Sequence, residues 1–266
     1  LKRSALFCLV FIMSTHTNNS SLIERLFSVG AHFGFKKSRR HPTVAPYLFG
    51  TKEGNDIFDL EKTAALIADA AAVMNEAGLA GKTVLFVGTK TEVVESVRKA
   101  AEKVAMPYVV NRWIGGILSN FSEIKKRIHR LEELQSGTAS GELERKYTKK
   151  ERMVLGREAT KLDHNFKGIS TMTKLPDLMV AVDPRHDHIA VKEARSMKVP
   201  VMGIMSSDCD VSVVTHPVLV NDSLQGSVDM ILAELTTAFA SGRAAYVPKP
   251  AAPRTETRVR PRTVRP

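Results

Sequence analysis

The chain alternates apolar, β-rich runs with helical stretches over most of its length. Five runs have the composition of strands, at residues 83–87, 108–110, 177–183, 199–205 and 216–220, the last suited to a sheet edge. Helical stretches occur at residues 60–77, 92–104, 189–197 and 224–240, and Gly242 is expected to end the last one. Strands joined through helices favour right-handed crossovers. We therefore expect an α/β fold, a doubly wound, flavodoxin-like parallel sheet flanked by helices.

One long segment, residues 120–167, interrupts this alternation because it contains no strand-like run. Asn120 with Glu123, and Thr148 with Glu151, fit the capping box that opens a helix, and residues 136–141 fit a flexible turn between two helices. Apolar side chains recur at helical spacing, namely Ile124, Ile128, Leu131 and Leu134, then Leu155, Leu162 and Phe166. The segment is predicted to be an inserted antiparallel helical hairpin that projects from the core. The basic side chains of this hairpin either contact RNA or simply form a solvated helix surface.

The region before the first long helix has a different character. Residues 22–29 fit a short helix that Gly30 ends, and residues 31–46 fit a cation-rich loop in which prolines prevent regular pairing. Residues 47–50 and 57–60 then fit a hairpin or two short strands.

Both ends of the chain fall outside the expected domains. Residues 1–21 form a leader in which Met13 is the expected start of translation. Residues 1–12 are therefore interpreted as an extension that precedes the native protein. The alternative is a secreted protein, if these residues act as a signal peptide. Residues 22–119 and 168–242 make the α/β core, and residues 120–167 make the hairpin. Residues 243–266 are rich in Pro, Arg and Thr and are expected to be a disordered basic tail.

The positive charge lies on appendages and not on the core. The net charge is +11, but residues 36–40, 122–167 and 247–266 with Lys2 and Arg3 carry +15, so everything else carries −4. Such clustering is typical of a polyanion-binding surface, whereas charge used only for solubility would be spread. Two cysteines without a CxxC pair exclude a disulfide scaffold and a zinc ribbon, and they favour a reducing compartment.

Tests for catalytic chemistry are mostly negative. Gly81-Lys82-Thr83 precedes a strand, so it does not fit a phosphate loop. Gly88-Thr89-Lys90 follows a strand, where α/β folds bind ligands, and a nucleotide-dependent enzyme is the alternative function that it supports. Residues 183–188 hold ligand-type side chains, but helix capping by Asp183 or Asp187 fits them better than a metal or catalytic site. Asp208 and Asp210 share that ambiguity. The lack of a coherent active site favours a binding protein.

The stretch 111–121 joins the second predicted strand to the basic hairpin. It contains the only tryptophan, Trp113, beside Arg112, followed by the paired glycines Gly115 and Gly116. A flat ring next to a guanidinium suits nucleic acid. The same pattern also fits a tight turn in which Trp113 is a packing anchor, and the sequence leaves both interpretations open.

Ordered motifs along the chain resemble the bacterial small-subunit ribosomal protein two family. They are Gly30-Ala31-His32-Phe33-Gly34, residues 46–50, 57–63 and 85–90, Arg112-Trp113-Ile114-Gly115-Gly116 with Asn120, residues 148–151, 175–177 and 186–190, and Glu193-Ala194. The resemblance covers residues 22–242. It departs from the family at Phe35, where a second His is usual, and at residues 206–211 and 219–222, so loop contacts and any bound ion there are open.

The resemblance implies a structural component of the small ribosomal subunit, between head and body on the solvent side. It implies small-subunit ribosomal RNA and other small-subunit proteins, including the largest one, as partners. We expect a cytoplasmic, ribosome-bound protein with no enzymatic activity, cofactor, metal or membrane contact. The residues predicted to contact RNA are Lys36, Lys37, Arg39, Arg40, Lys90, Arg112, Trp113, Asn120, Lys125, Lys126, Arg127 and Arg130.

Overall fold

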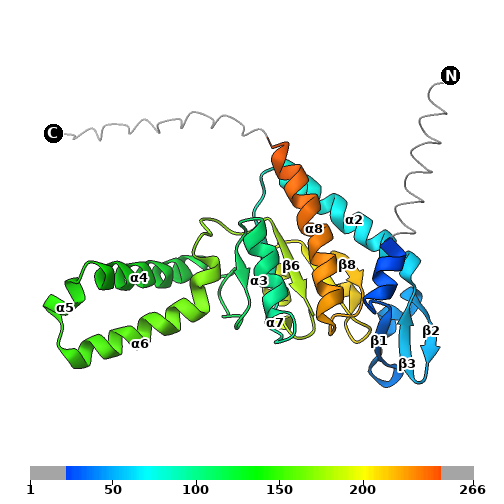
Figure 1. Ribbon diagram of the computed structural model, residues 1–266, viewed down its shortest axis with the longest axis horizontal. Helices are drawn as coiled ribbons and strands as arrows, with labels where there is room; N and C mark the ends of the chain where they lie inside the picture. Colours follow the sequence, from blue (N-terminus) through cyan, green and yellow to red (C-terminus); the bar gives the residue numbers. More distant parts are fainter. Residues whose placement is uncertain (1–21, 247–266) are drawn as a thin grey trace, which may run out of the picture.

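Five parallel strands form the centre of the molecule, a computed structural model that describes residues 22–246 of the 266 (Figure 1). They are β4 (Val84–Val87), β5 (Tyr108–Val109), β6 (Leu178–Val182), β7 (Val201–Met205) and β8 (His216–Leu219). Their order in the sheet is β5-β4-β6-β7-β8, which is the flavodoxin-like arrangement. The predicted fold class and the edge position of the last strand are confirmed.

Helices cover both faces of this sheet, and alternating strand residues face each layer. Figure 1 shows α2 (Leu60–Leu79), α3 (Val94–Lys103) and α8 (Gln225–Ala244) gathered on one side. Their apolar side chains share one buried cluster with Phe86 and Val180. On the other face, α7 (His188–Ser196) packs in a second cluster with Leu85 and Met179. The sheet therefore has a packed core on each face.

The closing helix α8 runs through Gly242 to Ala244, so the prediction that Gly242 ends the helix was wrong. Gly242 instead lets α8 lie close against α2, because a Cβ at Gly242 would lie 2.2 Å from Asn75 O. Gly78 on α2 has the matching role, since its Cβ would lie 2.4 Å from Phe239 O. The lack of side chains at Gly78 and Gly242 thus allows the backbones of α2 and α8 to pack closely.

A second sheet of three antiparallel strands lies beside β8 and α2 (Figure 1). It contains β1 (Phe33–Lys36), β2 (Leu48–Lys52) and β3 (Asn55–Phe58) in the order β1-β3-β2. The β2–β3 hairpin is confirmed. The loop prediction was wrong for Phe33–Lys36, which pair with β3, because the prolines that prevent pairing come only later, in the 3-10 helix Pro42–Tyr47.

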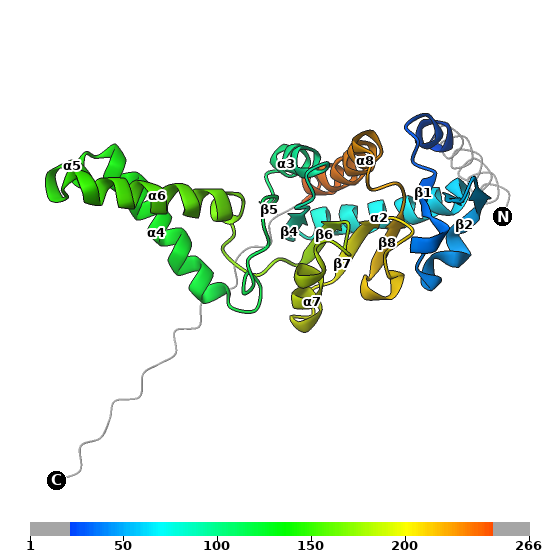
Figure 2. The same ribbon diagram turned by 90° about the horizontal axis from the view of Figure 1, so that it is seen from below.

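The hairpin consists of α4 (Phe121–Ala139), α5 (Glu142–Lys146) and α6 (Lys149–Phe166), and it projects away from the sheet (Figure 2). The stripe of α4 is buried throughout, as are Leu162 and Phe166 of α6. The Thr148–Glu151 capping box is confirmed. The Asn120 box was wrong, because the Asn120 side chain makes no capping bond. The turn is also shorter than predicted, since α4 continues to Ala139 and only residues 140–141 separate it from α5.

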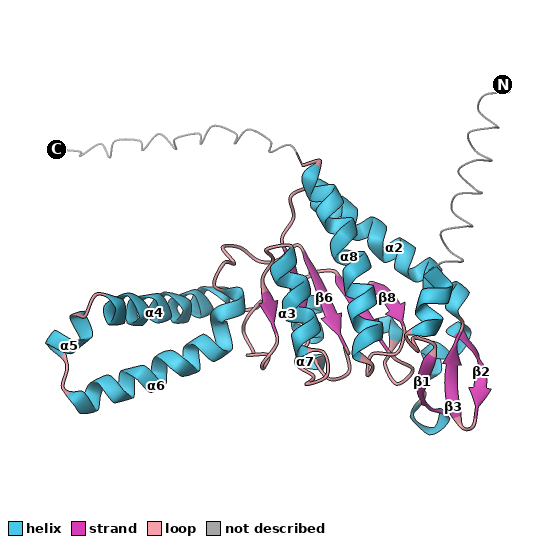
Figure 3. Ribbon diagram, in the orientation of Figure 1, coloured by secondary structure: helices cyan, strands magenta, loops and turns pink. Residues whose placement is uncertain are grey.

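Loops follow the carboxyl ends of the parallel strands (Figure 3), and those after β7 and β8 form hydrogen bonds with residues next to or within the second sheet. None of the helices in residues 22–246 is long and apolar enough to cross a bilayer. Some predictions fall outside the described residues: the leader, the start at Met13 and residues 247–266 of the tail. The tail was expected to begin at residue 243, but Arg243 and Ala244 belong to α8.

Candidate nucleic-acid interface

A short cationic segment, residues 36–41 and here called the basic loop, is fixed to the carboxyl end of β7. The backbone N–H of His41 donates to the carbonyl of Ser207 over 2.8 Å. Just before the loop, the Phe35 N–H donates to Ser207 Oγ over 2.9 Å. Ser207 follows a fully buried strand, so these bonds hold the loop against the most rigid part of the core.

Arg40 faces inward from this loop. Its guanidinium forms a bidentate pair with Asp56, with Nε 2.8 Å from Oδ2, and also donates to Thr51 Oγ1. Asp56 is completely buried, and its hydrogen bond, partly offset by burial, holds the pKa of Arg40 above its usual value. The charge of Arg40 is therefore used inside the protein, so we do not carry this residue into the RNA-facing set.

Arg39 faces outward, and it has a partner that the sequence did not indicate. Arg39 Nη2 lies 2.8 Å and Arg185 Nη1 lies 2.7 Å from the same oxygen, Asp208 Oδ2. The Asp208 side chain is 5% exposed, whereas those of Arg39 and Arg185 are 53% and 55% exposed. The Arg39 guanidinium also lies 4.2 Å from the centre of the Phe35 ring. One buried carboxylate thus positions two guanidinium groups at the surface.

These arginines border a cavity of about 500 Å³ at the carboxyl edge of the sheet. Its lining residues are Arg39, Arg40, His41, Pro184, Arg185, His188, Asp208, Asp210 and Val213. Arg185 was missed because it lay in a segment interpreted as a capping turn. Its position directly after β6, at the ligand-binding edge of a parallel sheet, was the available signal.

Lys90, predicted to contact RNA, lies below this surface in a group of acids. Its Nζ is 3.3 Å from Asp183 Oδ2 and 3.7 Å from Asp222 Oδ1, and its side chain is only 17% exposed. Burial alone would lower the pKa of Lys90, but Asp222 and Asp183 raise it overall. The adjacent Thr89 donates through N–H and Oγ1 to Asp187. The Gly88–Lys90 strand end is thus filled by the protein's own side chains, which does not support the nucleotide-enzyme alternative.

The same acids are the best metal-type arrangement in residues 22–246. Ligand atoms of Asp183, Cys209 and Asp222 lie within 4.8 Å of one another. Burial, then the charge of Asp183, raises the pKa of Asp222 to about 7, and burial also raises the pKa of the Cys209 thiol. The ammonium group of Lys90 already lies beside Asp183 and Asp222, where a metal ion would otherwise supply the positive charge. His186 and His188 do not join the group, and Asp183 caps the following turn by accepting from His186 N–H over 3.1 Å.

Trp113 is an internal anchor, and its use as an open stacking face is not supported. Its ring is 7% exposed, and Nε1 donates to Glu193 Oε2 over 2.9 Å. Glu193 Oε1 accepts from the backbone N–H groups of Gly116, Leu118 and Ser119, and from Ser119 Oγ. Burial alone would raise the pKa of Glu193, but these hydrogen bonds lower it overall. The neighbouring Arg112 is exposed.

Cations on α4 divide into paired and unpaired groups. Lys126 lies 2.6 Å from Glu123, and Arg130 contacts both Glu133 and Glu158. Lys125 lies 5.0 Å from the centre of the Phe121 ring. Within the described residues, Lys36, Lys37, Arg112, Lys125 and Arg127 are exposed and make no ion pair. Asn120 is exposed at the start of the same helix.

The chain is similar to known proteins over most of its length. The family described as ribosomal protein S2 matches residues 26–242. The small ribosomal subunit protein uS2 of Corynebacterium diphtheriae is 40% identical over 223 residues, 84% of each chain. The uS2 protein of Sulfurimonas denitrificans is 39% identical over 219 residues, 82% of this chain and 84% of its own. The uS2c protein of Emiliania huxleyi is 36% identical over 221 residues, 83% of this chain and 96% of its own.

Proposed function

The chain belongs to the ribosomal protein S2 family, and from this premise we propose how it binds ribosomal RNA. The protein is a structural component of the small ribosomal subunit, and the alternative of a nucleotide-dependent enzyme is not supported. The residues that contact RNA and the neighbouring proteins are our proposal.

The primary RNA contact is the basic loop together with Arg185. Lys36 and Lys37 offer exposed ammonium groups that are unpaired within residues 22–246, and Arg39 and Arg185 offer guanidinium groups that Asp208 holds in place. Asp208 accepts from one edge of each guanidinium, which leaves other N–H donors for phosphate oxygens. The observation that carries this proposal is the shared carboxylate, because it orders both side chains before RNA arrives and lowers the entropy cost of binding.

A second RNA contact runs along the base and first arm of the hairpin. Arg112, Lys125 and Arg127 are exposed and unpaired among the described residues, and Asn120 lies between them in sequence. Lys126 and Arg130 contribute less, because glutamates already neutralise them. Such contacts hold the phosphate backbone and fix the protein's position, while RNA shape and unpaired bases supply selectivity.

Neighbouring ribosomal proteins, including the largest small-subunit protein, are assigned to an apolar surface at the end of the molecule opposite the hairpin, beside the basic loop (Figure 1). Phe27, Phe33 and Phe49 are 62%, 49% and 83% exposed, and Phe27 stacks on His32 with ring centres 4.6 Å apart. Exposed aromatic rings of this kind favour a protein contact. Changing Phe27 and Phe49 to Ser should leave RNA binding intact and lower the content of a neighbouring protein in washed subunits. Unchanged protein content would contradict this assignment.

Co-sedimentation with washed small subunits tests the RNA proposal. The triple variant Lys36→Ala, Lys37→Ala, Arg39→Ala should bind more weakly, and the slope of log K against log salt should fall by about one for each phosphate that is no longer neutralised. The variant Lys82→Ala, Lys103→Ala removes exposed charges elsewhere and is the control. Equal slopes for the triple variant and the unchanged protein would show that the basic loop is not at the interface.

A further inference from the structure

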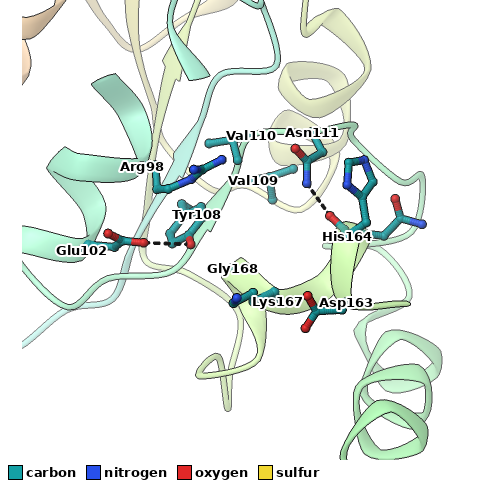
Figure 4. Close-up of a pocket in the computed structure, with 11 residues that line it drawn as sticks. Arg98, Glu102, Tyr108, Val109, Val110, Asn111, Asp163, His164, Lys167 and Gly168 are labelled. Carbon is teal, nitrogen blue, oxygen red and sulfur yellow. Dashed lines mark hydrogen bonds between the residues drawn. The ribbon is translucent and has the colours of Figure 1, made fainter. Parts of the chain in front are cut away.

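A second cavity of about 380 Å³ lies at the open edge of the central sheet, away from the basic loop (Figure 4). It lies between α3, β5 and the junction of α6 with the 3-10 turn Lys167–Ile169. Its lining is polar and consists of Arg98, Glu102, Tyr108, Val109, Val110, Asn111, Asp163, His164, Asn165, Lys167 and Gly168. The volume is near the lower end of the roughly 300–1,000 Å³ of small-ligand sites, so it fits one small planar group and not a duplex.

The back of this cavity is the free side of an edge strand. Val109 O accepts from Gly88 N–H, and Pro107 O accepts from Phe86 N–H, so both groups point toward β4. Backbone groups alternate in direction along a strand, and those of Tyr108 and Val110 therefore point outward, toward the cavity. Gly168 closes one side, since a Cβ there would lie 2.3 Å from Tyr108 O. Gly168 thus covers the Tyr108 carbonyl, and the recess keeps the outward backbone groups of Val110 at its base.

The side chains that line this recess include planar groups and one amide. In Figure 4 the Arg98 guanidinium lies beside Tyr108, whose hydroxyl donates to Glu102 Oε1 over 3.1 Å. The His164 imidazole is on the opposite side, next to Asn111, whose amide donates to the His164 carbonyl. That bond orients the Asn111 side chain and leaves its own carbonyl oxygen free to accept. Arg98 and His164 are groups on which bases stack, and Asn111 is a group that reads their edges.

Charge separates this cavity from the basic loop. The charged side chains of the lining, Arg98, Lys167, Glu102 and Asp163, sum to zero, and Arg98 also pairs with Glu95 outside the lining over 3.3 Å. A neutral recess does not concentrate phosphate, but its carboxylates can accept hydrogen bonds from the amino groups of bases. Lys167 is exposed at the rim, and the exposed Arg112 follows Asn111 directly in the chain. Cations at the rim and hydrogen-bond acceptors inside match a nucleotide whose base enters and whose phosphate stays outside.

We propose that this cavity binds the base of one unstacked ribonucleotide of ribosomal RNA, an inference that rests on the proposed function. Arg98 and His164 flank the base, Asn111 and the outward backbone groups of Val110 bond its edge, and Lys167 and Arg112 neutralise its phosphates. An added protein strand fits less well. Strand addition needs a run of open backbone groups, whereas β5 has two residues and Gly168 lies against it.

The test uses subunits that lack this protein, reconstituted with the full chain or a variant, and probes the bases of the RNA with dimethyl sulfate. The double variant Asn111→Ala, His164→Ala removes exposed side chains and leaves the core unchanged. The control Gln225→Ala, Ser241→Ala removes exposed polar side chains that lie outside the cavity and outside both proposed RNA contacts. Lys167→Glu, which reverses the rim charge without touching the base, is a second variant.

The unchanged protein should protect one unpaired base, and the double variant should raise the reactivity of that base about tenfold at unchanged subunit occupancy, within the range expected when stacking is removed. Lys167→Glu should raise it as well, and the control should not. Protection that is equal in the double variant, or no protected unpaired base at all, overturns the inference and leaves the proposed function standing. Absence of the unchanged protein from washed subunits would overturn both.

Discussion

The basic loop and the first arm of the hairpin carry similar numbers of cations but position them differently. In the basic loop, Arg39 and Arg40 are held by Asp208 and Asp56, which come from other parts of the chain. On α4, Lys126 and Arg130 pair with glutamates three residues away on the same helix, and Arg130 also contacts Glu158 on α6. Charge in the loop is ordered by tertiary structure, whereas charge on the arm is ordered mainly by helical spacing.

This difference determines which charges remain for RNA. In the loop, buried Asp56 takes up the charge of Arg40, whereas buried Asp208 orients Arg39 outward. On the arm, glutamates neutralise some cations, while Lys125 and Arg127 make no ion pair within residues 22–246. Net charge in a segment therefore overstates its capacity for phosphate, and the partner of each cation decides its use. Substitutions of those partners therefore test the difference between the basic loop and the arm.

The largest expected effect is at Asp56. Asp56→Ala removes the buried partner of Arg40 and should lower the free energy of unfolding by about 3–5 kcal/mol. Urea denaturation measures this decrease, with Asp69→Ala, an exposed aspartate on α2, as control. Similar decreases in the two variants would show that tertiary pairing does not hold the loop.

A substitution at Glu193 tests the segment that connects the sheet to the arm. Glu193→Ala leaves the donors of Trp113, Gly116, Leu118 and Ser119 without their acceptor, and should cost about 2–4 kcal/mol in denaturant unfolding. Because the folded pKa of Glu193 is below its ordinary 4.5, this contribution is complete above pH 4.5 and is lost as pH falls through the folded value. A variant with unchanged stability and acid sensitivity would contradict this role.

A pH dependence of the opposite sign is expected at Asp222, beneath the basic loop. Its pKa is about 7 in the folded protein against an ordinary 3.8, so the folded state holds the proton more tightly. Its contribution is therefore complete below pH 3.8 and is lost as pH rises toward 7. Asp222→Asn resembles the protonated form, so it should reduce the loss of stability between pH 5 and pH 8, on a scale of about 1.4 kcal/mol per pKa unit. Thermal unfolding at both pH values measures this, and Asp229→Asn, at an exposed position, should change nothing.

Two variants of equal charge test the paired and unpaired cations of the arm. Lys125→Ala with Arg127→Ala should lower the salt slope of subunit binding by about two. Lys126→Ala with Arg130→Ala should lower it by less, because glutamates already neutralise both side chains. Equal slopes in the two variants would show that pairing on the helix does not limit RNA contact.

The smallest effect is expected from the pairs themselves. Glu123→Ala removes an exposed partner three residues from Lys126, and such pairs stabilise a helix by only about 0.2–0.5 kcal/mol. Thermal unfolding should therefore hardly change, while subunit binding should strengthen slightly because Lys126 becomes free. A decrease in stability near that of Asp56→Ala would remove the distinction between the two regions.

Local patterns were sufficient to predict most of the fold. Apolar runs such as Val84–Val87, with helices between them, indicated the parallel sheet, and the stripe from Ile124 to Leu134 indicated the hairpin. The failures were at positions where distant contacts decide. By local rules Gly242 indicates a helix end, but its contact with Asn75 keeps it helical. Phe33–Lys36 lacks a strand pattern and becomes a strand only by pairing with β3.

The candidate site was less predictable for the same reason. The sequence located the cations but not their partners, since Asp208 lies 169 residues from Arg39 along the chain. It therefore grouped Arg40 and Lys90, whose charges are used internally, with Lys36 and Lys37, which make no ion pair in the described part of the chain. It also left out Arg185, which tertiary structure alone brings beside Arg39.

The apolar core of the hairpin is continuous with that of the sheet, since Ile124 and Leu131 belong to one cluster with Val87 and Met179. A helix of 19 residues extends about 28 Å, and the arm α4 therefore reaches that far from a base built into the sheet. The arm and the basic loop thus belong to one continuously packed body, so the fold itself fixes the distance between the two proposed RNA contacts.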